Sequence, residues 1–426
     1  MHADRPELVG AQPGAPIHAD LLIEGATEVF DGLQVWPGAR VVVAQGRVVA
    51  VGTELPPEVV VDAATERLDV EGGLVTPGLI DAHTHLVFAG DRADEYALRA
   101  AGRGYLEIAA AGGGIASTVR ATRAADRATL VALARPRLDR LLACGVTTAE
   151  VKSGYGLDFT TEMRILEAIR DLDAEHPVDL VATFLGAHTL PPERRHDRVG
   201  YLDEVVERMI PAVAAAGLAT FCDVFVERSA FTVEEGARVL TAGLAHGLRP
   251  KIHADQLSAG GGAELGAHLG AVSADHLEHV SAAGIAALAA AGTVAVLLPG
   301  AAIFLGDDAR APARRLIEAG VPVALSTDCN PGTCMTENLP LMLTLGMSRL
   351  GLSPLEVLQA VTVHAAQAVG RAATAGRLLP GRAADIAVFS VPSHRHLPYR
   401  FGLPPTRYVL KQGRVVYRSA AGCAAH

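Results

Sequence analysis

The sequence predicts an α/β protein: a TIM-like (β/α)8 barrel with a small β-sandwich domain formed by the N- and C-terminal segments. Three observations support this prediction. Short apolar strands alternate with Ala/Leu-rich helical stretches through the middle of the chain. These strands number about eight, the count that closes a barrel. Two similar hairpin patterns stand at opposite ends of the sequence, one before and one after the alternating region.

The two hairpin patterns predict the sandwich. VVVAQGRVVAV (41–51) places Gln45-Gly46 between two β-branched runs, and YVLKQGRVVYR (408–418) repeats this around Gln412-Gly413. Glycine supplies the positive φ of a tight hairpin turn, and valine favours a pleated strand. A chance recurrence of QGRVV is the alternative. We expect one β-domain built from residues 1–72 and 378–426, with the barrel (residues 73–377) inserted between its two parts.

The barrel strands are expected in sequence order. They are LVTPGLIDAH from Leu74, GVTTAEV from Gly145, VDLVATFLGAH from Val178, CDVFVE from Cys222, RPKIHAD from Arg249, AVSADHLEH from Ala271, TVAVLLPG from Thr293 and VPVALSTD from Val321. Helical stretches such as ATLVALARPRLDRLLA and EGARVLTAGLAHG lie between them. A doubly wound open sheet is the alternative, but no G-x-G-x-x-G follows a strand and no G-x-x-x-x-G-K-[ST] occurs, which disfavours nucleotide-binding folds.

Composition excludes several functional classes. The 426 residues are 50% apolar and 20% charged, as in a soluble globular protein, and the net charge of −10 argues against a nucleic-acid partner. No apolar run reaches the roughly 18 residues of a membrane span, and the N-terminus lacks a signal-peptide pattern. The cysteines at 144, 222, 329, 334 and 423 are scattered, which favours reduced thiols. We expect a cytoplasmic protein that acts on a small molecule, with no nucleic acid and no membrane.

Polar side chains gather where the predicted strands end. The first strand ends in DAHTH (81–85), the fifth in KIHADQ (251–256), the sixth in DHLEH (275–279) and the eighth in LSTD (325–328). Alternate residues of a strand face the same way, so His83 and His85 should both face the barrel mouth, where barrel enzymes place their active sites. Nitrogen ligands with one carboxylate suit zinc or iron and leave a position for water. Each residue alone could be a core histidine or a helix cap, but four such strand ends favour metal-dependent hydrolysis.

This arrangement resembles the amidohydrolase superfamily of metal-dependent hydrolases. Within it, the imidazolonepropionase family is the one resembled by the segments GDRADEY, GGGI, KSGYGLD, TFLGAHT, KIHADQ and TDCNPGT. The resemblance runs from about Leu74 to Asp385 and takes in the split terminal β-domain. It implies hydrolytic opening of the ring of 4-imidazolone-5-propanoate to N-formimidoyl-L-glutamate, in L-histidine degradation. It also implies one metal ion per subunit, zinc or iron.

The resemblance assigns roles to individual residues. The implied metal ligands are His83, His85, His253 and Asp328. The implied catalytic positions are Asp328 as proton shuttle, His276 as the group that stabilises the carbonyl oxygen, and Gln256. The implied substrate contacts are Arg92, Tyr155, His188, Gln256, Asn330, Gly332 and Thr333. At position 256 some relatives have glutamate, and the amide of Gln256 cannot act as a general base.

Several alternatives stay open at this point. Arg92 offers a fork for the propanoate carboxylate, but a surface ion pair with Asp91 or Asp94 is equally reasonable without the resemblance. Lys152 follows the second strand rather than the fourth and is interpreted as an ordinary lysine, Cys329 and Cys334 as packing residues, and the glycines at 112–114 and 260–262 as loops. The rival functions are an aminohydrolase acting on a purine- or pyrimidine-like ring and a non-catalytic barrel serving as an assembly module. A homodimer is also compatible with the sequence.

Overall fold

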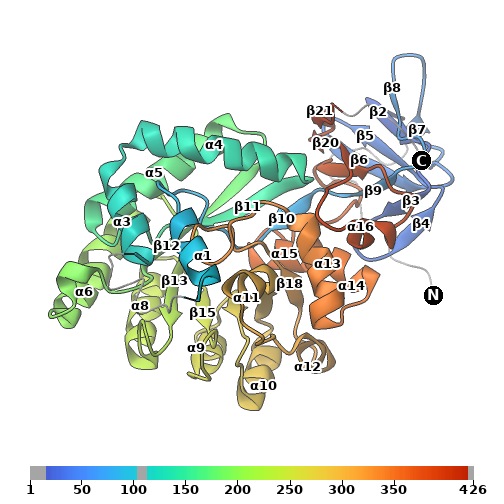
Figure 1. The fold of residues 1–426 in the computed structure, drawn as a ribbon. Coiled ribbons are helices and arrows are strands. Elements are labelled where there is room, and N and C mark those ends of the chain that lie inside the picture. The colour runs from blue at the N-terminus through green and yellow to red at the C-terminus, as the bar shows by residue number, and fades with distance from the viewer. Residues whose placement is uncertain (1–15, 103–112, 421–426) are drawn as a thin grey trace.

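The computed structural model describes residues 16–102 and 113–420 and confirms the barrel (Figure 1). Eight strands within these residues pair in parallel, each with its neighbour along the chain. They are β10 (Leu79–Asp81), β11 (Val146–Lys152), β12 (Asp179–Ala187), β13 (Phe221–Val226), β15 (Ile252–Ala254), β16 (Ser273–His276), β17 (Val294–Leu297) and β18 (Val323–Leu325), with the short β14 (Arg249–Pro250) also on β13. The first fifteen residues, Gly112 of the GGGI segment and Cys423 lie outside the described residues.

The first predicted strand is in fact two strands. β9 (Leu74–Pro77) pairs with strands of the terminal domain, whereas β10 pairs with β11 of the barrel. The chain changes sheets at Gly78, whose N–H donates to the carbonyl of Asp385 (2.8 Å). A side chain at this position would overlap that of Thr147. The apolar run does not reveal this division, because both halves are buried and equally hydrophobic.

The first and last barrel strands meet through their C-terminal extensions. The amide of Asp328 donates to the carbonyl of His83 (3.1 Å), and the amide of His85 donates to the carbonyl of Cys329 (3.0 Å). The carboxylate of Asp81 accepts hydrogen bonds from the hydroxyls of Ser326 and Thr327. These contacts bring the HxH segment next to Asp328, so the closure of the barrel also assembles the candidate site.

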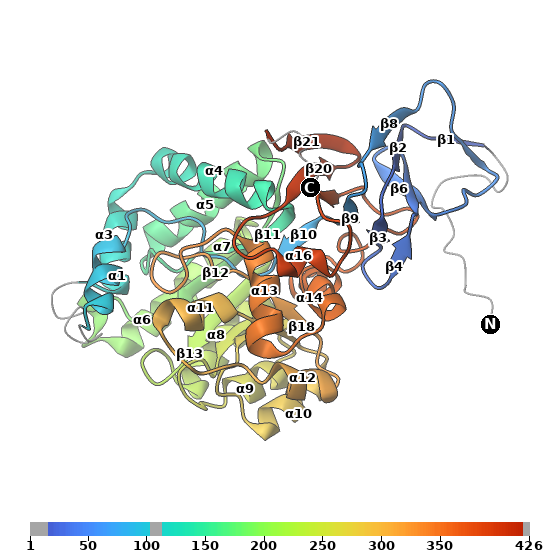
Figure 2. The same ribbon diagram turned by 45° about the vertical axis from the view of Figure 1, so that its right-hand side comes forward.

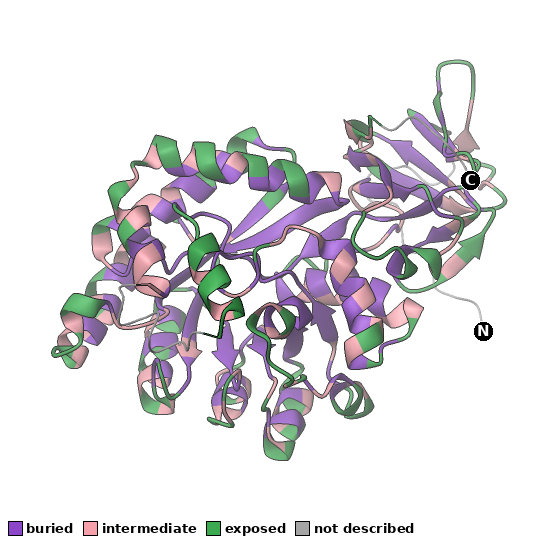
Figure 3. Cartoon of the chain, in the orientation of Figure 1, coloured by how far each residue is buried: buried purple, intermediate pink, exposed green. Residues whose placement is uncertain are grey.

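Helices surround the barrel, and most of them turn a buried face towards its strands, whereas α1 has no buried residue (Figures 1 and 3). They are α1 (Ala93–Ala100), α3 (Ile115–Ala124), α4 (Arg127–Ala143), α5 (Phe159–Glu175), α6 (Arg198–Glu204), α7 (Ile210–Ala215), α8 (Val233–Ala245), α9 (Gly262–His268), α10 (Ala282–Ala291), α11 (Pro299–Leu305), α12 (Ala313–Glu318), α13 (Leu339–Leu350), α14 (Pro354–Ala360), α15 (Val363–Ala368) and α16 (His396–Tyr399), with a 3₁₀ turn at Pro192–Arg194 and a π-helical turn at Val205–Met209. Two of them, α4 and α8, match the helical stretches predicted from the sequence. Among the described residues, no helix combines the length and apolar character needed to cross a membrane.

The terminal domain combines both ends of the chain, as predicted (Figure 2). Its sheets have the orders β21-β20-β19-β9-β3-β4 and β6-β5-β2-β8, with a separate pair β1-β7. The strands are β1 (Ile17–His18), β2 (Leu21–Glu24), β3 (Glu28–Phe30), β4 (Val35–Pro37), β5 (Arg40–Ala44), β6 (Arg47–Gly52), β7 (Val59–Val60), β8 (Glu66–Asp69), β19 (Ile386–Phe389), β20 (Thr406–Lys411) and β21 (Arg414–Arg418). A buried cluster that includes Val29, Val41, Val75 and Ile386 lies between the two larger sheets.

Both predicted hairpins are present, and their turns contact each other. Gln45-Gly46 and Gln412-Gly413 all have positive φ, as a two-residue hairpin turn requires. The amide of Ala384 donates to the carbonyl of Gly46 (2.9 Å), and the amide of Gly413 donates to the carbonyl of Ala384 (2.9 Å). The repeated QGRVV pattern therefore brings the two ends of the chain into one domain.

Candidate metal centre and substrate pocket

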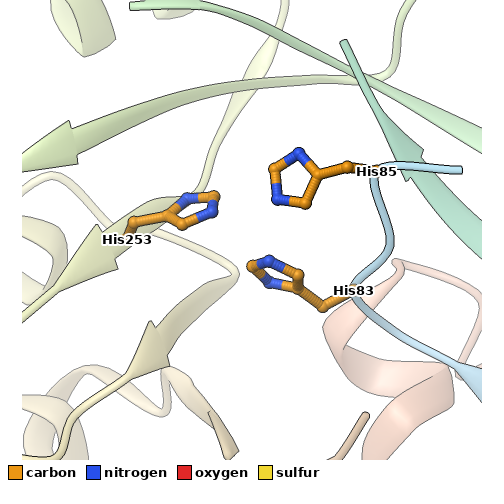
Figure 4. Close-up of side chains that lie close together, drawn as sticks. All are labelled: His83, His85 and His253. Atoms are coloured by element: carbon orange, nitrogen blue, oxygen red, sulfur yellow. The ribbon is translucent and has the colours of Figure 1, made fainter. Parts of the chain in front are cut away.

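Three histidines converge at the barrel mouth. His83 and His85 follow β10, and His253 lies within β15 (Figure 4). One ring nitrogen of each lies within 4.8 Å of one ring nitrogen of the others, and all three residues are buried. Their positions follow from strand alternation in the HxH segment and from the placement of the fifth strand in the barrel. The structure thus brings together the three histidines that the sequence singled out.

Asp328, which follows the last barrel strand β18, lies next to His83 and His85. Its Oδ1 lies 3.5 Å from Nε2 of His83 and 3.7 Å from Nε2 of His85, too far for hydrogen bonds. Two ligand atoms bound to one zinc at about 2.0–2.1 Å in a tetrahedral arrangement stand roughly 3.4 Å apart. The spacing of these donors therefore fits a shared metal ion.

Carboxylates behind the histidines orient two of the rings. Nδ1 of His83 lies 2.7 Å from Oδ2 of Asp275, and Nδ1 of His253 lies 3.0 Å from Oδ2 of Asp223. An ionised carboxylate only accepts hydrogen bonds, so Nδ1 of His83 carries the proton and Nε2 of this ring keeps its lone pair. Nδ1 of His253 lies beside Asp223 but has no hydrogen bond among the described residues. Within the described structure, Nε2 of the buried His83 has no hydrogen-bond partner. A nitrogen lone pair buried in this way is what a metal ligand requires.

The charge states of these groups suit metal binding as well. Burial, with help from Lys152 and His253, lowers the pKa of His83 well below its ordinary value, so the ring is neutral. Burial likewise lowers the pKa of His85. Neutral imidazole is the form that binds a metal. Burial raises the pKa of Asp328 to about 7 in the absence of an ion, and a bound cation would favour its charged form.

The loop after β18 fixes Asp328 and the residues that follow it. Asp328 has a positive φ, and its Oδ2 accepts a hydrogen bond from the hydroxyl of Thr333 (3.0 Å). Oδ1 of Asn330 accepts hydrogen bonds from the amides of Gly332 and Thr333, both at 2.8 Å. The predicted contacts Asn330, Gly332 and Thr333 therefore form one turn beside the candidate metal ligand.

A cavity of about 560 Å³ opens above this centre. Most of the predicted site residues line it, namely His85, Arg92, Tyr155, His188, His253, Gln256, His276, Asp328, Asn330 and Thr333. Its other walls include Ile115, Phe225, Ser229 and Leu305, which the sequence did not single out. These residues come from separate segments and show no local pattern, so only the fold reveals them.

Histidine and tyrosine rings form the wall next to the metal ligands. The ring of His188 stacks on that of His85, with centroids 5.2 Å apart and planes inclined by 13°. Nδ1 of His188 faces the carbonyl of Gly154 (3.0 Å), and burial lowers the pKa of His188 to about 4. The ring of Tyr155 lies 5.6 Å from that of His188. Both residues therefore lie at the barrel mouth, as the sequence analysis expected.

His276 ends β16 in a strained backbone conformation. Its φ is 80°, and Leu277 after it also has a positive φ. The ring lies 5.3 Å from that of His253, and its Nδ1 has no hydrogen-bond partner among the described residues. Residues in such conformations cluster at functional sites, where surrounding packing holds a side chain in a required direction.

Arg92 forms neither of the surface ion pairs considered above. Its Nε lies 2.8 Å from Oε2 of Glu95, and only 12% of the Arg92 side chain is exposed. The guanidinium of Arg92, which directly precedes α1, also packs against Gly332 in the loop after β18. Arg92 is therefore a pocket residue. Cys329 and Cys334 are buried, in agreement with the predicted packing role.

Comparison with known proteins places the chain in a class. An Amidohydrolase family model matches residues 227–417. The fold is similar to a triazine hydrolase variant (20% identity, TM-score 0.68, 93% of this chain and 94% of the other). It is also similar to the zinc complex of an atrazine chlorohydrolase from Arthrobacter aurescens TC1 (19% identity, TM-score 0.63, 93% and 95%). The C-terminal part of the chain thus matches the Amidohydrolase family, and the chain shares the fold of these hydrolases.

Sequence relatives narrow this class to one family. An imidazolonepropionase of Myxococcus xanthus (strain DK1622) is 50% identical over 95% of this chain and 99% of its own length. Those of Geobacillus thermodenitrificans (strain NG80-2) and Symbiobacterium thermophilum are 47% and 48% identical, each over 93% of this chain and over 94% and 97% of their own lengths. The chain belongs to the imidazolonepropionase family.

Proposed function

We propose that this chain opens the ring of 4-imidazolone-5-propanoate with water, giving N-formimidoyl-L-glutamate in L-histidine degradation. One observation carries the proposal: a single cavity is lined by the candidate metal ligands His85, His253 and Asp328 and by Arg92, with the fourth candidate ligand, His83, 3.5 Å from Asp328. A ring amide attached to a flexible carboxylate arm needs both features. A neutral base has no carboxylate to pair with a guanidinium, so the aminohydrolase alternative leaves Arg92 without a charged substrate partner.

His83, His85, His253 and Asp328 would hold one metal ion, zinc or iron. When bound, such an ion lowers the pKa of its water from about 15.7 towards 7 and polarises a nearby carbonyl. Nitrogen and carboxylate donors suit either metal, and the spacing of the donors does not distinguish them. Asp275 holds His83 with the ring proton on Nδ1, and Asp223 lies 3.0 Å from Nδ1 of His253.

Asp328 and His276 would carry out the proton transfer and charge stabilisation. The carboxylate of Asp328 can accept the proton released from the attacking water and return it to the departing ring nitrogen. The buried ring of His276 can donate a hydrogen bond to the ring carbonyl oxygen as negative charge develops there. The amide of Gln256 would orient the substrate by hydrogen bonding, because it has no proton to exchange at neutral pH.

The rest of the pocket would orient the substrate. Arg92 would bind the propanoate carboxylate with a charge-assisted bidentate hydrogen bond. The turn of Asn330, Gly332 and Thr333 presents backbone and side-chain polar groups next to Asp328, and Tyr155 and His188 line the pocket beside His85. These contacts would place the ring carbonyl next to the metal ligands.

Direct assay of the purified, metal-loaded protein tests the proposal. Imidazolonepropanoate should be consumed with stoichiometric formation of N-formimidoyl-glutamate, while purine and pyrimidine bases should release no ammonia. Turnover of a base with no action on imidazolonepropanoate would support the aminohydrolase instead. The homodimer and the cytoplasmic location stay predictions, and light scattering of the purified protein tests the first.

A further inference from the structure

A layer of charged residues fills the barrel interior behind the metal centre. Alternate residues on four strands point inward here and carry charges where barrels usually have aliphatic side chains. The charged layer consists of Glu150, Lys152, Asp223, Lys251 and Asp275, each with 0% exposure. Three carboxylates therefore face two ammonium groups with no access to solvent.

Lys152 occupies the centre of this charged layer. Its Nζ lies 2.8 Å from Oδ2 of Asp223, 3.2 Å from Oδ2 of Asp275 and 3.1 Å from Oε1 of Glu150. The first two of these oxygens are the same atoms that face Nδ1 of His253 and Nδ1 of His83. One ammonium group thus bridges both carboxylates that orient the histidine ligands.

We propose that Lys152 is a positioning residue of the metal centre, whose ammonium group holds Asp223 and Asp275 in the orientation that fixes His253 and His83 as ligands. The inference deepens the proposed function and rests on its assignment of the ligands. It replaces the sequence-based interpretation of Lys152 as an ordinary lysine.

Electrostatics explains why this position requires a cation. Two buried carboxylates close to each other cannot both stay ionised without a compensating charge. Burial alone would lower the pKa of Lys152, but Asp223, Glu150 and Asp275 raise it overall, so the ammonium form persists. Without that ammonium group, Asp223 and Asp275 would lose the cation that both contact, and one of them would turn away from its histidine. The histidine that it orients would then lose its acceptor.

Lys251 provides a matched control within the same layer. It is also fully buried, and its Nζ pairs with Oε1 of Glu150 (2.8 Å) and lies 5.1 Å from the ring centroid of Phe221. A carboxylate oxygen of Glu150 lies within 4.8 Å of a ring nitrogen of His83, but no hydrogen bond joins these two residues. Replacing Lys251 therefore removes a buried lysine of the charged layer while leaving Asp223 and Asp275 with their bridge.

The experiment compares Lys152→Met with Lys251→Met in the full-length protein. Zn²⁺ affinity is measured by competition with a chromogenic chelator, and the visible absorption of the Co²⁺-loaded proteins reports the ligand geometry. Loss of an outer partner of a metal ligand typically weakens metal binding about 10- to 100-fold. We expect a loss of this size and an altered Co²⁺ spectrum for Lys152→Met, with both properties near wild type for Lys251→Met. Wild-type affinity and spectrum in Lys152→Met, or equal losses in both variants, would overturn the inference.

A double variant separates positioning from charge balance. Glu150→Gln combined with Lys152→Met removes one charge of each sign, so the net charge of the layer is unchanged and the protein can fold even where the single variant does not. Weak Zn²⁺ binding should persist in the double variant. Recovery of wild-type affinity would show that Lys152 acts only as a counter-ion. A separate measurement on His83→Ala tests the ligand assignment itself, because unchanged Zn²⁺ affinity there contradicts the proposed function and not the role of Lys152.

Discussion

The guanidinium of Arg92 lies so close to Gly332 that a Cβ at position 332 would overlap its Nη1 atom. On its other side, Nε of Arg92 is held by Glu95, whose Oε1 accepts a hydrogen bond from the amide of Gly114 (3.0 Å). The arginine is therefore confined between α1 and the loop after β18. Because Gly332 has no side chain, the guanidinium of Arg92 can occupy this position in the pocket.

Replacing Gly332 by alanine should displace the fork of Arg92 without touching the metal ligands. We expect KM to rise by roughly tenfold, the loss of about 1.4 kcal/mol in substrate binding, with a smaller change in kcat. Steady-state kinetics measure both constants. Gly260→Ala is the matched control, because its Cβ would meet nothing nearer than Oδ1 of Asp255 at 3.8 Å. An unchanged KM in Gly332→Ala would show that the position of Arg92 does not matter for binding.

Replacing Arg92 by methionine should remove the proposed carboxylate contact. A charge-assisted hydrogen bond contributes roughly 1.5–3 kcal/mol, so kcat/KM should fall about ten- to a hundredfold, mostly through KM. An analogue with a carboxamide in place of the carboxylate should be poor with the wild type and lose little more with the variant. If both enzymes show the same ratio between acid and amide, the carboxylate is bound elsewhere.

Asp328→Asn and His276→Asn should lower kcat far more than they raise KM. Both groups are assigned to the transition state, and loss of one positioned proton-transfer group costs about 10² to 10⁴ in rate. Metal content is measured beside the kinetics, because Asp328 is also a proposed ligand. Near-normal kcat in either variant, with its metal retained, contradicts the assigned role.

One metal ion per chain should be required for turnover and not for the fold. The proposed ligands lie at the barrel mouth, whereas a large cluster of apolar side chains from strands and helices packs the rest of the barrel domain outside the charged layer. Elemental analysis should give one equivalent in the wild type and much less in His83→Ala and His253→Ala, with similar circular dichroism spectra. Full activity of a metal-free preparation would exclude the mechanism.

Glu278 should make the protein less stable as the pH rises. Burial, with smaller effects from Asp328 and Asp307, raises the pKa of Glu278 from 4.5 to about 8. Between these values the folded state holds a proton that the unfolded state has released, so the free energy of unfolding falls with increasing pH. Its contribution is complete below the unfolded value and lost above about 8.

Glu278→Gln should remove this pH dependence. Each pKa unit corresponds to about 1.36 kcal/mol, so between pH 5 and pH 8 the wild type should lose at least about 1.4 kcal/mol more than the variant. Urea unfolding of the metal-loaded proteins at the two pH values measures the difference. Parallel pH profiles for the two proteins would contradict the assignment.

Local sequence patterns predicted the barrel strands, both hairpins and the shared direction of His83 and His85, because each depends on strand alternation or turn geometry. The choice of His253 and Asp328 as their partners came from the family resemblance. The division at Gly78 was not predicted, since it depends on close packing against Thr147. The ion pair of Arg92 with Glu95 was also missed, because charged residues nearby in sequence offered three equivalent partners. The spacing of residues at the start of α1 places Glu95 next to Arg92, and this pairing is visible only in the folded chain.

The charged layer could have been suspected from the sequence. Glu150 and Lys152, and likewise Lys251 and His253, are separated by one residue within otherwise apolar strands, so each pair must face the same side. The sequence could not show that Nζ of Lys152 contacts one carboxylate oxygen of Asp223 and one of Asp275. Nor could it show that the same two oxygens face Nδ1 of His253 and Nδ1 of His83. That relationship depends on the register between strands, which has no local signal.

The position of β9 has a consequence for how the protein forms during translation. β9 pairs with β3 on one side and with β19 on the other, where Leu74 lies opposite Phe389. Almost the whole barrel lies between these partners, so the ribosome needs tens of seconds, at about 5–20 residues per second, to deliver the second one. Throughout that interval one edge of β9 offers unpaired amides and carbonyls to other nascent chains. We therefore expect this edge of β9 to be open to aggregation during synthesis, until β19 pairs with it.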